Sequence, residues 1–326
     1  MKSFANVSPK TLAQAQSAVD SARRSGKSVA VAGGGSDLLG QMKDRLITPD
    51  VVVHLRGIRG ADHIEATGGK VVIGGLATLD QVAHHAAIRG PLTVLSEAAE
   101  SVATPQIRNV ATIAGNVNQR PWCWYYRNGF QCFKNGGNRC YSVDGENQFH
   151  AIFGGGPSYI VHPSDTAVAL VALDATFAIG GPSGRRTIKA SDFFTLPTMN
   201  PSRENALKEG EILESIAVPA PRAPVRSTYH KIMDREAWTH AIASAAVVME
   251  MDGAVCRSAR IVLGGVAPIP WRLPEVEKIL AGKRVTPELA AQAGEQAVAG
   301  ARALAKNAYK IPMTQAMVRR TIASLV

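Results

Sequence analysis

Residues 118–163 follow no regular secondary-structure pattern, and any fold of this chain has to hold them in place. Glycine and asparagine are frequent in this segment, aromatic side chains cluster near its start, and neither the helical nor the strand spacing of apolar residues persists. Irregular segments of such length are uncommon in compact domains. Three of the four cysteines lie within it: Cys123, Cys132 and Cys140. We therefore expect a metal group to order the segment.

The spacing of these cysteines favours one kind of metal group. Cys123-x8-Cys132-x7-Cys140 suits an iron–sulfur cluster, whose corners are well separated, better than the paired Cys-x2–4-Cys spacing of structural zinc. Disulfides explain it less well, because three is an odd number and the expected compartment is reducing. Zinc and free buried thiols stay open as alternatives. Cys256 lies far along the chain and is expected to be a small core residue.

Helices and strands alternate before this segment. Apolar groups at helical spacing end at Gly26, where a helix C-cap is expected. The predicted order is a helix over 10–24, a strand over 28–32, a glycine turn, a helix start over 38–42, strands over 51–55 and 71–74, and a helix over 79–89. The first hundred residues therefore predict an α and β mixture.

Regular patterning returns at residues 167–173. The proline-rich stretch 218–224 is the best candidate for a linker, and we place a domain boundary near residue 222. The patterns beyond it predict strands over 241–251 and 258–265 and an alanine-rich helix over 286–306. The last hundred residues are expected to form a compact α+β unit.

A run of glycines follows the strand predicted over 28–32. Gly33-Gly34-Gly35-Ser36 lets the backbone turn tightly and present N–H groups to a phosphate, and Ser36 adds a hydroxyl donor. The run matches neither the P-loop nor the Gly-x-Gly-x-x-Gly fingerprint, so a plain surface turn is the alternative. A second loop over 111–116 combines small residues with Thr and Asn side chains. Two such loops can clamp one extended cofactor that carries a pyrophosphate.

The net charge of +10 allows nucleic acid, an acidic partner subunit or an anionic cofactor as counterpart. The basic residues are scattered and only 6% of residues are aromatic, so we expect no nucleic acid. No apolar stretch is long enough for a membrane-spanning helix, and the first residues lack an apolar signal core. We expect no membrane span and no export of this chain on its own.

Three segments together resemble the FAD-binding medium subunit of the molybdenum hydroxylases, the family of xanthine dehydrogenase, aldehyde oxidoreductase and carbon monoxide dehydrogenase. They are residues 31–38 (VAGGGSDL), 107–116 (IRNVATIAGN) and 162–165 (HPSD). The resemblance implies an α+β chain with a two-subdomain FAD-binding fold of the PCMH (vanillyl-alcohol oxidase-like) type and a smaller α+β C-terminal domain. The implied bounds are 1–222, with subdomains of about 1–57 and 58–222 and an insertion of about 118–163, and then 223–326.

The resemblance also implies which residues bind FAD. The diphosphate is cradled by Val31, Ala32, Gly33, Gly34, Gly35, Ser36, Asp37 and Leu38. The flavin and its ribityl chain are lined by Val102, Thr112, Ile113, Ala114, Gly115 and Asn116. Asp165 accepts hydrogen bonds from cofactor hydroxyls, and Leu213 and Lys231 match further positions near the flavin. Taken alone, Leu213 is expected in the core and Lys231 as a solvated charge.

The cysteine segment resembles that of the bacterial aldehyde oxidoreductase branch, whose FAD subunit carries an extra [4Fe–4S] cluster. The 4-hydroxybenzoyl-CoA reductase subunit has a comparable insertion. A fourth cysteine is expected at or beside position 158, where this chain has Ser158. Three arrangements follow: Ser158 or water completes the cluster, His150 supplies the fourth corner, or the cluster is [3Fe–4S]. We favour a [4Fe–4S] cluster with a non-cysteine fourth ligand.

The implied function is electron transfer. Electrons pass from a large molybdenum-cofactor subunit and a small [2Fe–2S] subunit through FAD to an external acceptor, in a heterotrimer or a dimer of it, and no residue of this chain has a further catalytic role. The compartment is the cytoplasm, or the periplasm if the small subunit carries an export signal. Two alternatives are a stand-alone FAD oxidase, with the residues after 222 as substrate cap, and a zinc-stabilised nucleic-acid-binding module.

Overall fold

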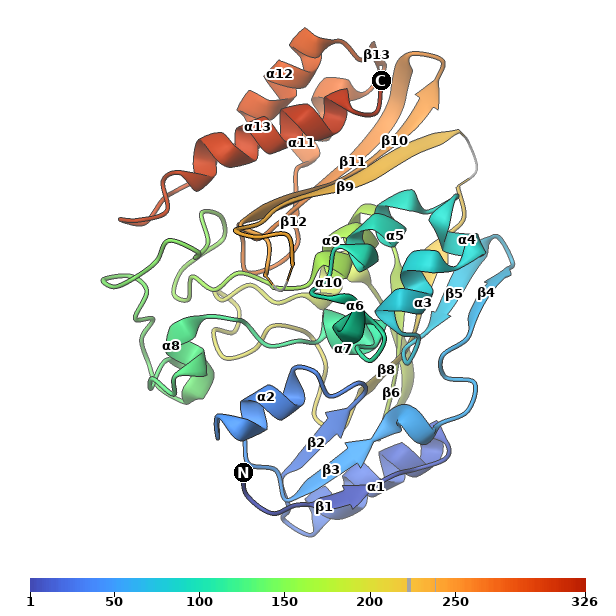
Figure 1. The fold of residues 1–326 in the computed structure, drawn as a ribbon, viewed down its shortest axis with the longest axis vertical. Helices are drawn as coiled ribbons and strands as arrows, with labels where there is room; N and C mark the ends of the chain where they lie inside the picture. Colours follow the sequence, from blue (N-terminus) through green and yellow to red (C-terminus); the bar gives the residue numbers. More distant parts are fainter. Residues whose placement is uncertain (222–223, 238) are drawn as a thin grey trace.

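The computed structural model describes residues 1–221, 224–237 and 239–326. Three β-sheets lie one after another along the long axis, with the N-terminal sheet at one end and the C-terminal sheet with its helices at the other (Figure 1). The predicted boundary near residue 222 lies outside the described residues. The predicted linker is shorter than expected, because Val218 and Pro219 still belong to a strand.

The N-terminal sheet is parallel, in the order β1-β3-β2, with β1 (Ala5–Val7), β2 (Val29–Ala32) and β3 (Val51–His54). Its two helices are α1 (Leu12–Arg24) and α2 (Leu38–Lys43). Side chains alternate along a strand, so Val51 and Val53 pack with α1 while Val52 packs with Met42 of α2. The helix predicted from residue 10 begins at Leu12, because Thr11 caps it by accepting a hydrogen bond from the backbone of Gln14.

The central sheet is antiparallel, in the order β4-β5-β8-β6-β7. Its strands are β4 (Ile64–Thr67), β5 (Lys70–Gly74), β6 (Thr176–Gly181), β7 (Gly184–Lys189) and β8 (Ile212–Pro219). The short elements around it are η1 (Leu55–Gly57), α3 (Leu79–His84), α4 (Ala86–Arg89), α5 (Thr93–Glu100), α6 (Pro105–Arg108), α7 (Ile113–Val117), α9 (Asp165–Ala172) and α10 (Ala190–Phe193). Apolar side chains of α3, α5 and α9 form the largest core with this sheet. The helix predicted over 79–89 is interrupted at His85, whose extended backbone and ring nitrogen cap α4.

The C-terminal sheet has the order β12-β11-β10-β9, with β13 beside β11. Its strands are β9 (Val225–Ile232), β10 (Ala243–Asp252), β11 (Val255–Gly264), β12 (Trp271–Arg272) and β13 (Lys283–Arg284), and its helices are α11 (Pro274–Leu280), α12 (Pro287–Ala297) and α13 (Lys310–Ala323). The three helices cover one face and α5 and α9 lie under the other (Figure 1). Both faces of β10 are therefore buried, which explains its continuous apolar run.

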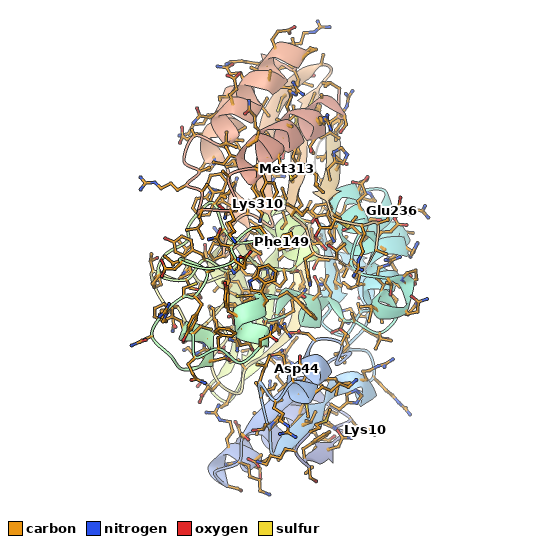
Figure 2. The ribbon with its side chains drawn as sticks, turned by 60° about the vertical axis from the view of Figure 1, so that its left-hand side comes forward. Lys10, Asp44, Phe149, Glu236, Lys310 and Met313 are labelled. Carbon is orange, nitrogen blue, oxygen red and sulfur yellow. The ribbon has the colours of Figure 1, made fainter. Side chains whose placement is uncertain are left out.

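The cysteine loop, residues 118–163, has little regular structure, as predicted. It contains α8 (Trp124–Arg127) and the 3₁₀ turn η2 (Phe133–Asn135). The C-terminal domain holds its second half: the buried Nζ of Lys310 donates to the carbonyls of Phe149 (3.0 Å), His150 (3.2 Å) and Gly265 (2.7 Å), and Figure 2 shows Lys310 next to Phe149.

Further contacts with the cysteine loop correct the prediction of a helix over 286–306. The helix ends at Ala297. The backbone N–H of Arg302 donates to Ile152, and that of Lys306 donates to the side chain of Asn147 (2.8 Å each). These residues bond to the cysteine loop instead of continuing a helical ladder.

Among the described residues, no helix is both long and apolar enough to span a bilayer.

Candidate functional site

A pocket of about 460 Å³ opens where the N-terminal sheet meets α6, α7 and the turn between β9 and β10. We call it the glycine-loop pocket. The predicted residues that line it are Val31, Ala32, Gly33, Gly34, Gly35, Ser36, Asp37, Leu38, Val102, Thr112, Gly115, Asn116 and Asp165. The two loops singled out from the sequence therefore meet at one cavity. Ile113, Ala114, Leu213 and Lys231 do not line it.

The glycines of the first loop are required by its contact with the second loop. A Cβ on Gly34 would collide with the carbonyl oxygen of Val110, and one on Gly33 would lie 2.5 Å from the Thr112 hydroxyl. Gly35 has a φ of +77°, a conformation that L side chains rarely adopt. The two backbones thus pack directly against each other, and residues of both loops line the cavity.

Three predicted residues support the second loop from behind. Ile113 is fully buried, and its backbone N–H donates to Ala77 (2.9 Å). Ala114 bonds through its N–H to the carbonyl of Gly75 (3.1 Å), and the carbonyl of Leu213 lies against the same glycine. Leu213 is buried in the core, which is what the residue taken alone predicts. These residues hold the pocket wall without reaching its surface.

Lys231 is not a solvated charge, which corrects the expectation for the residue taken alone. Its side chain is 3% exposed, and its Nζ lies 2.8 Å from Asp165 Oδ2 and 3.0 Å from the Ser101 carbonyl. Tyr229 donates its hydroxyl to Asp165 Oδ1 (2.5 Å), and burial, followed by the nearby Asp165 charge, raises the pKa of Tyr229 well above its usual value. Asp165 therefore presents a carboxylate to the pocket that two residues of β9 fix from behind.

Asn116 is oriented in a similar way. Its Oδ1 accepts hydrogen bonds from the hydroxyls of Ser164 and Thr166, both at 2.6 Å. Its amide nitrogen makes no hydrogen bond to another described residue, and Asn116 lines the pocket. The side chain can therefore offer two donors to a ligand.

Sequence reasoning missed the residues that close the pocket. Trp122 packs against His240 with ring centroids 5.2 Å apart, and the guanidinium of Arg127 lies 4.3 Å from the centre of the Trp122 ring. Burial lowers the pKa of His240, so the ring is neutral at pH 7. The other unpredicted lining residues include Gln41, Arg120, Arg235 and Thr239. These residues are far apart in sequence, so no local pattern joins them.

A second pocket collects the predicted metal ligands. Cys123, Cys132, Cys140 and Ser158 line it, together with two cations, Lys134 and Arg139, and no carboxylate is among the described residues that line it. We call it the cysteine pocket. Its remaining lining residues are Tyr125, Tyr126, Phe133, Tyr141 and Ile160.

The alternative fourth ligand, His150, lies beside this pocket. Its Nε2 is 3.4 Å from Cys123 Sγ, and its buried Nδ1 has no partner among the described residues. Burial lowers the pKa of His150 to about 4, so the ring is neutral at pH 7 and able to act as a ligand.

The chemistry of the cysteine pocket fits an anionic metal cluster. Burial raises the pKa of Cys123 to about 11, and the nearby Cys140 and Cys132 add to the rise, so a thiolate is costly there without a cation. No three His, Cys, Asp or Glu side chains in the described ranges are arranged to share one metal ion. Cluster thiolates bind different irons and need no such convergence. The cavity measures about 10 Å³, so the thiols would move apart around a cluster.

Comparison with known proteins identifies the family. Residues 2–221 match the FAD binding domain in molybdopterin dehydrogenase, and residues 228–325 match the CO dehydrogenase flavoprotein C-terminal domain. The chain belongs to this family of FAD-binding subunits. It is 35% identical to the aldehyde oxidoreductase FAD-binding subunit PaoB of Escherichia coli (strain K12), over 90% of this chain and 89% of that protein.

More distant members of the family agree. The chain is 27% identical to the nicotinate dehydrogenase FAD-subunit of Eubacterium barkeri, over 88% of this chain and 83% of that protein. The solved structure of reconstituted CO dehydrogenase from Oligotropha carboxidovorans superposes with a TM-score of 0.78 at 26% identity and covers 99% of this chain and 97% of that one. This FAD-binding subunit thus has a mixed α/β fold with an FAD-binding domain and a C-terminal domain.

Family membership confirms the predicted function: the chain is the FAD-containing electron-transfer subunit of a molybdenum hydroxylase, an oxidoreductase. The stand-alone oxidase loses its support, because the residues needed for a substrate cap match the family's own C-terminal domain. The zinc-stabilised nucleic-acid-binding module also loses its support, because the two family matches cover nearly the whole chain.

Proposed function

We propose that this FAD-binding subunit serves an aldehyde oxidoreductase-like complex with a large molybdenum-cofactor subunit and a small [2Fe–2S] subunit. The supporting observation is the meeting of residues 31–38 and Thr112, Gly115 and Asn116 at one pocket, in a chain 35% identical to the FAD-binding subunit of an aldehyde oxidoreductase. FAD supplies the transfer of electrons toward an external acceptor. The complex works in the cytoplasm, or in the periplasm if its small subunit is exported.

Each wall of the glycine-loop pocket has a proposed task. The backbone of residues 33–36 binds the FAD diphosphate through its N–H groups. Asn116 donates through its amide, and Asp165 accepts from cofactor hydroxyls while Lys231 and Tyr229 keep its carboxylate in place. Ile113, Ala114 and Leu213 support the flavin wall from the core. The side chain of Asp37 bonds to other residues of the chain, so its contribution to FAD comes through the loop that it orients.

We propose further that the cysteine pocket binds a [4Fe–4S] cluster, held by Cys123, Cys132 and Cys140 with Ser158 or water at the fourth corner. Such a cluster supplies one-electron transfer. Ser158 lines the pocket and is 2% exposed, whereas His150 does not line it, which favours Ser158 over His150 as the fourth ligand. Lys134 and Arg139 offset the negative charge of three thiolates bound to iron.

The domain organisation is part of the proposal. The FAD-binding part, residues 1–222, has the PCMH type of fold with subdomains of about 1–57 and 58–222, and residues 223–326 form the C-terminal domain. A separate β-sheet in each of the three parts supports this division. The relatives include FAD subunits of an aldehyde oxidoreductase and of a nicotinate dehydrogenase, and both subunits resemble this chain. Similar FAD subunits thus serve different substrates, so we place the choice of organic substrate on the large subunit.

The test is metal and flavin analysis of the full chain purified without air. Flavin absorption bands together with broad iron–sulfur absorption and about four irons per FAD are expected. Acid precipitation should release the flavin, because we assign no residue to a covalent link. Stoichiometric zinc without iron would overturn the cluster, and a colourless protein would overturn FAD binding in this chain.

A further inference from the structure

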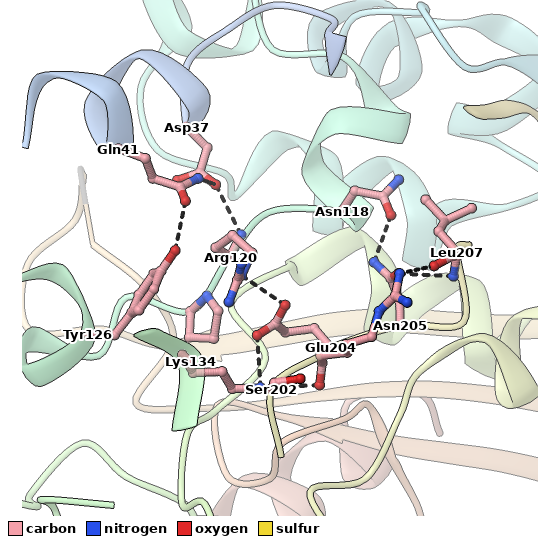
Figure 3. Close-up of polar contacts among 12 residues, drawn as sticks. Asp37, Gln41, Asn118, Arg120, Tyr126, Lys134, Ser202, Glu204, Asn205 and Leu207 are labelled. Carbon is pink, nitrogen blue, oxygen red and sulfur yellow. Dashed lines mark hydrogen bonds and ion pairs between the residues drawn. The ribbon is translucent and has the colours of Figure 1, made fainter. Parts of the chain in front are cut away.

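The two pockets share a wall. Gln41 of α2 lines the glycine-loop pocket, Tyr126 of α8 lines the cysteine pocket, and the Tyr126 hydroxyl donates to Gln41 Oε1 at 2.8 Å (Figure 3). Both side chains are buried, at 4% and 1% exposure. The aromatic shell of one site is thus bonded directly to the helix that begins at the other site.

A second connection runs through one carboxylate that lines neither pocket. Glu204 places Oε2 2.9 Å from Nε of Arg120, which lines the glycine-loop pocket, and Oε1 2.8 Å from Nζ of Lys134, which lines the cysteine pocket (Figure 3). The side chains of Glu204 and Lys134 are 7% and 2% exposed. Salt screens such a buried group weakly, so the charge of Glu204 helps to hold both cations in place.

The two cations repel each other across this carboxylate. Both lie within 3 Å of Glu204, Arg120 through Nε at 2.9 Å and Lys134 through Nζ at 2.8 Å, so only this carboxylate stands between their charges. Neutralising Glu204 would leave two like charges without their shared partner, and removing one member of a buried pair is strongly destabilising. Each cation would then move away from the other, and each movement would change the wall of its own pocket.

Asp37 adds a third tie on the same side. It precedes α2 but makes no capping hydrogen bond. Its carboxylate instead accepts from Arg127 (2.7 Å), from the backbone N–H of Arg120 (3.0 Å) and from Gln41 (2.9 Å). The end of the glycine loop is therefore bonded to the cysteine loop.

We propose that Glu204 is a positioning residue that couples the two sites, so that FAD in the glycine-loop pocket and iron in the cysteine pocket strengthen each other's binding. The proposal rests on the proposed iron–sulfur cluster. Coupling between two sites is reciprocal, so iron that orders Lys134 must favour FAD by the same factor by which FAD favours iron. The element that transmits the coupling is the chain Arg120–Glu204–Lys134, because it contacts the wall of both pockets.

The experiment measures FAD affinity of the full 326-residue chain, iron-loaded and iron-depleted by a chelator, from the quenching of flavin fluorescence. The wild-type chain should bind FAD about tenfold more tightly when iron-loaded. In Glu204→Gln this ratio should fall toward one. Lys134→Met gives a second variant, in which the ratio should also fall toward one. A merely structural loss would weaken FAD binding in both states and leave the ratio unchanged.

Glu214→Gln is the matched control. Glu214 is 8% exposed and also pairs with an arginine, Arg185 at 3.0 Å, but these two residues line neither the glycine-loop pocket nor the cysteine pocket. It should keep the wild-type ratio. If the wild-type chain takes up iron but its FAD affinity is the same with and without iron, the coupling alone is overturned. The same holds if Glu204→Gln and Lys134→Met both keep the wild-type ratio. Failure of the wild-type chain to take up iron overturns the cluster and the coupling together.

Discussion

The glycine-loop pocket is lined by turns and helix ends whose shape backbone hydrogen bonds maintain, whereas the cysteine pocket is lined by side chains of an irregular loop. The first measures about 460 Å³ and the second about 10 Å³. In the first, glycines allow two backbones to touch, and buried partners fix Asn116 and Asp165. In the second, burial raises the pKa of Cys123 to about 11, so a thiolate there is costly without a cation. One site is preformed, and the other depends, in our proposal, on the metal group that it binds.

Substitution of Gly34 gives the largest expected effect on the preformed site. In Gly34→Ala the new Cβ meets the Val110 carbonyl, so the two loops must separate and FAD content should fall below a tenth of wild type. Flavin and iron analysis of the same sample checks this. The control is Gly40→Ala, because a Cβ at Gly40 meets nothing within 4 Å. Full flavin content in Gly34→Ala would show that the loop contact does not set the pocket.

Cys132→Ser tests the proposed metal site. Iron content should fall below half, and the melting temperature should drop by several degrees, because the loop between α7 and α9 loses the group that orders it. The affinity for FAD should fall about tenfold because of the coupling, but FAD binding should not be abolished. Cys256→Ala is the control: Cys256 is fully buried but lines neither pocket, so it should leave iron unchanged. Equal iron loss in both variants would contradict a site at the loop.

The same difference explains what the sequence could predict. The glycine loop, its strand and the start of α2 are set by neighbours within a few residues, so the pattern found them. Lys231 was expected in solvent because its partner Asp165 is distant along the chain, and only the fold brings them together. The helix predicted to 306 ends at Ala297 because its continuation bonds to Asn147 and Ile152. Long-range pairs leave no local period, and Glu204, Trp122 and His240 were missed for that reason.

His162, at the end of the cysteine loop, should make the stability of the folded chain sensitive to acid. Burial, followed by the nearby Lys134 charge, lowers the pKa of His162 to about 3, so the folded chain keeps it neutral while the unfolded chain binds a proton below pH 6.5. Stability should fall as pH drops from 6.5 toward 3, by about 1.4 kcal/mol per pH unit from this group. In His162→Phe the free energy of unfolding, measured with urea, should depend less on pH in that range. Parallel pH profiles for the two proteins would exclude His162 as the cause.

The smallest change separates the fourth ligand from the other three. Ser158→Cys keeps side-chain size nearly constant in a position that is 2% exposed, so flavin content and melting temperature should stay at wild-type values. If Ser158 occupies the fourth corner, the new thiolate replaces a hard oxygen ligand with a softer sulfur ligand, and the cluster potential followed by electron paramagnetic resonance should shift from the wild-type value. Ser96→Cys is the comparison, because Ser96 is also buried, at 5% exposure, but lines neither pocket and bonds to the Ala83 carbonyl. An unchanged potential in Ser158→Cys would move the fourth ligand to His150, the imidazole already in contact with Cys123.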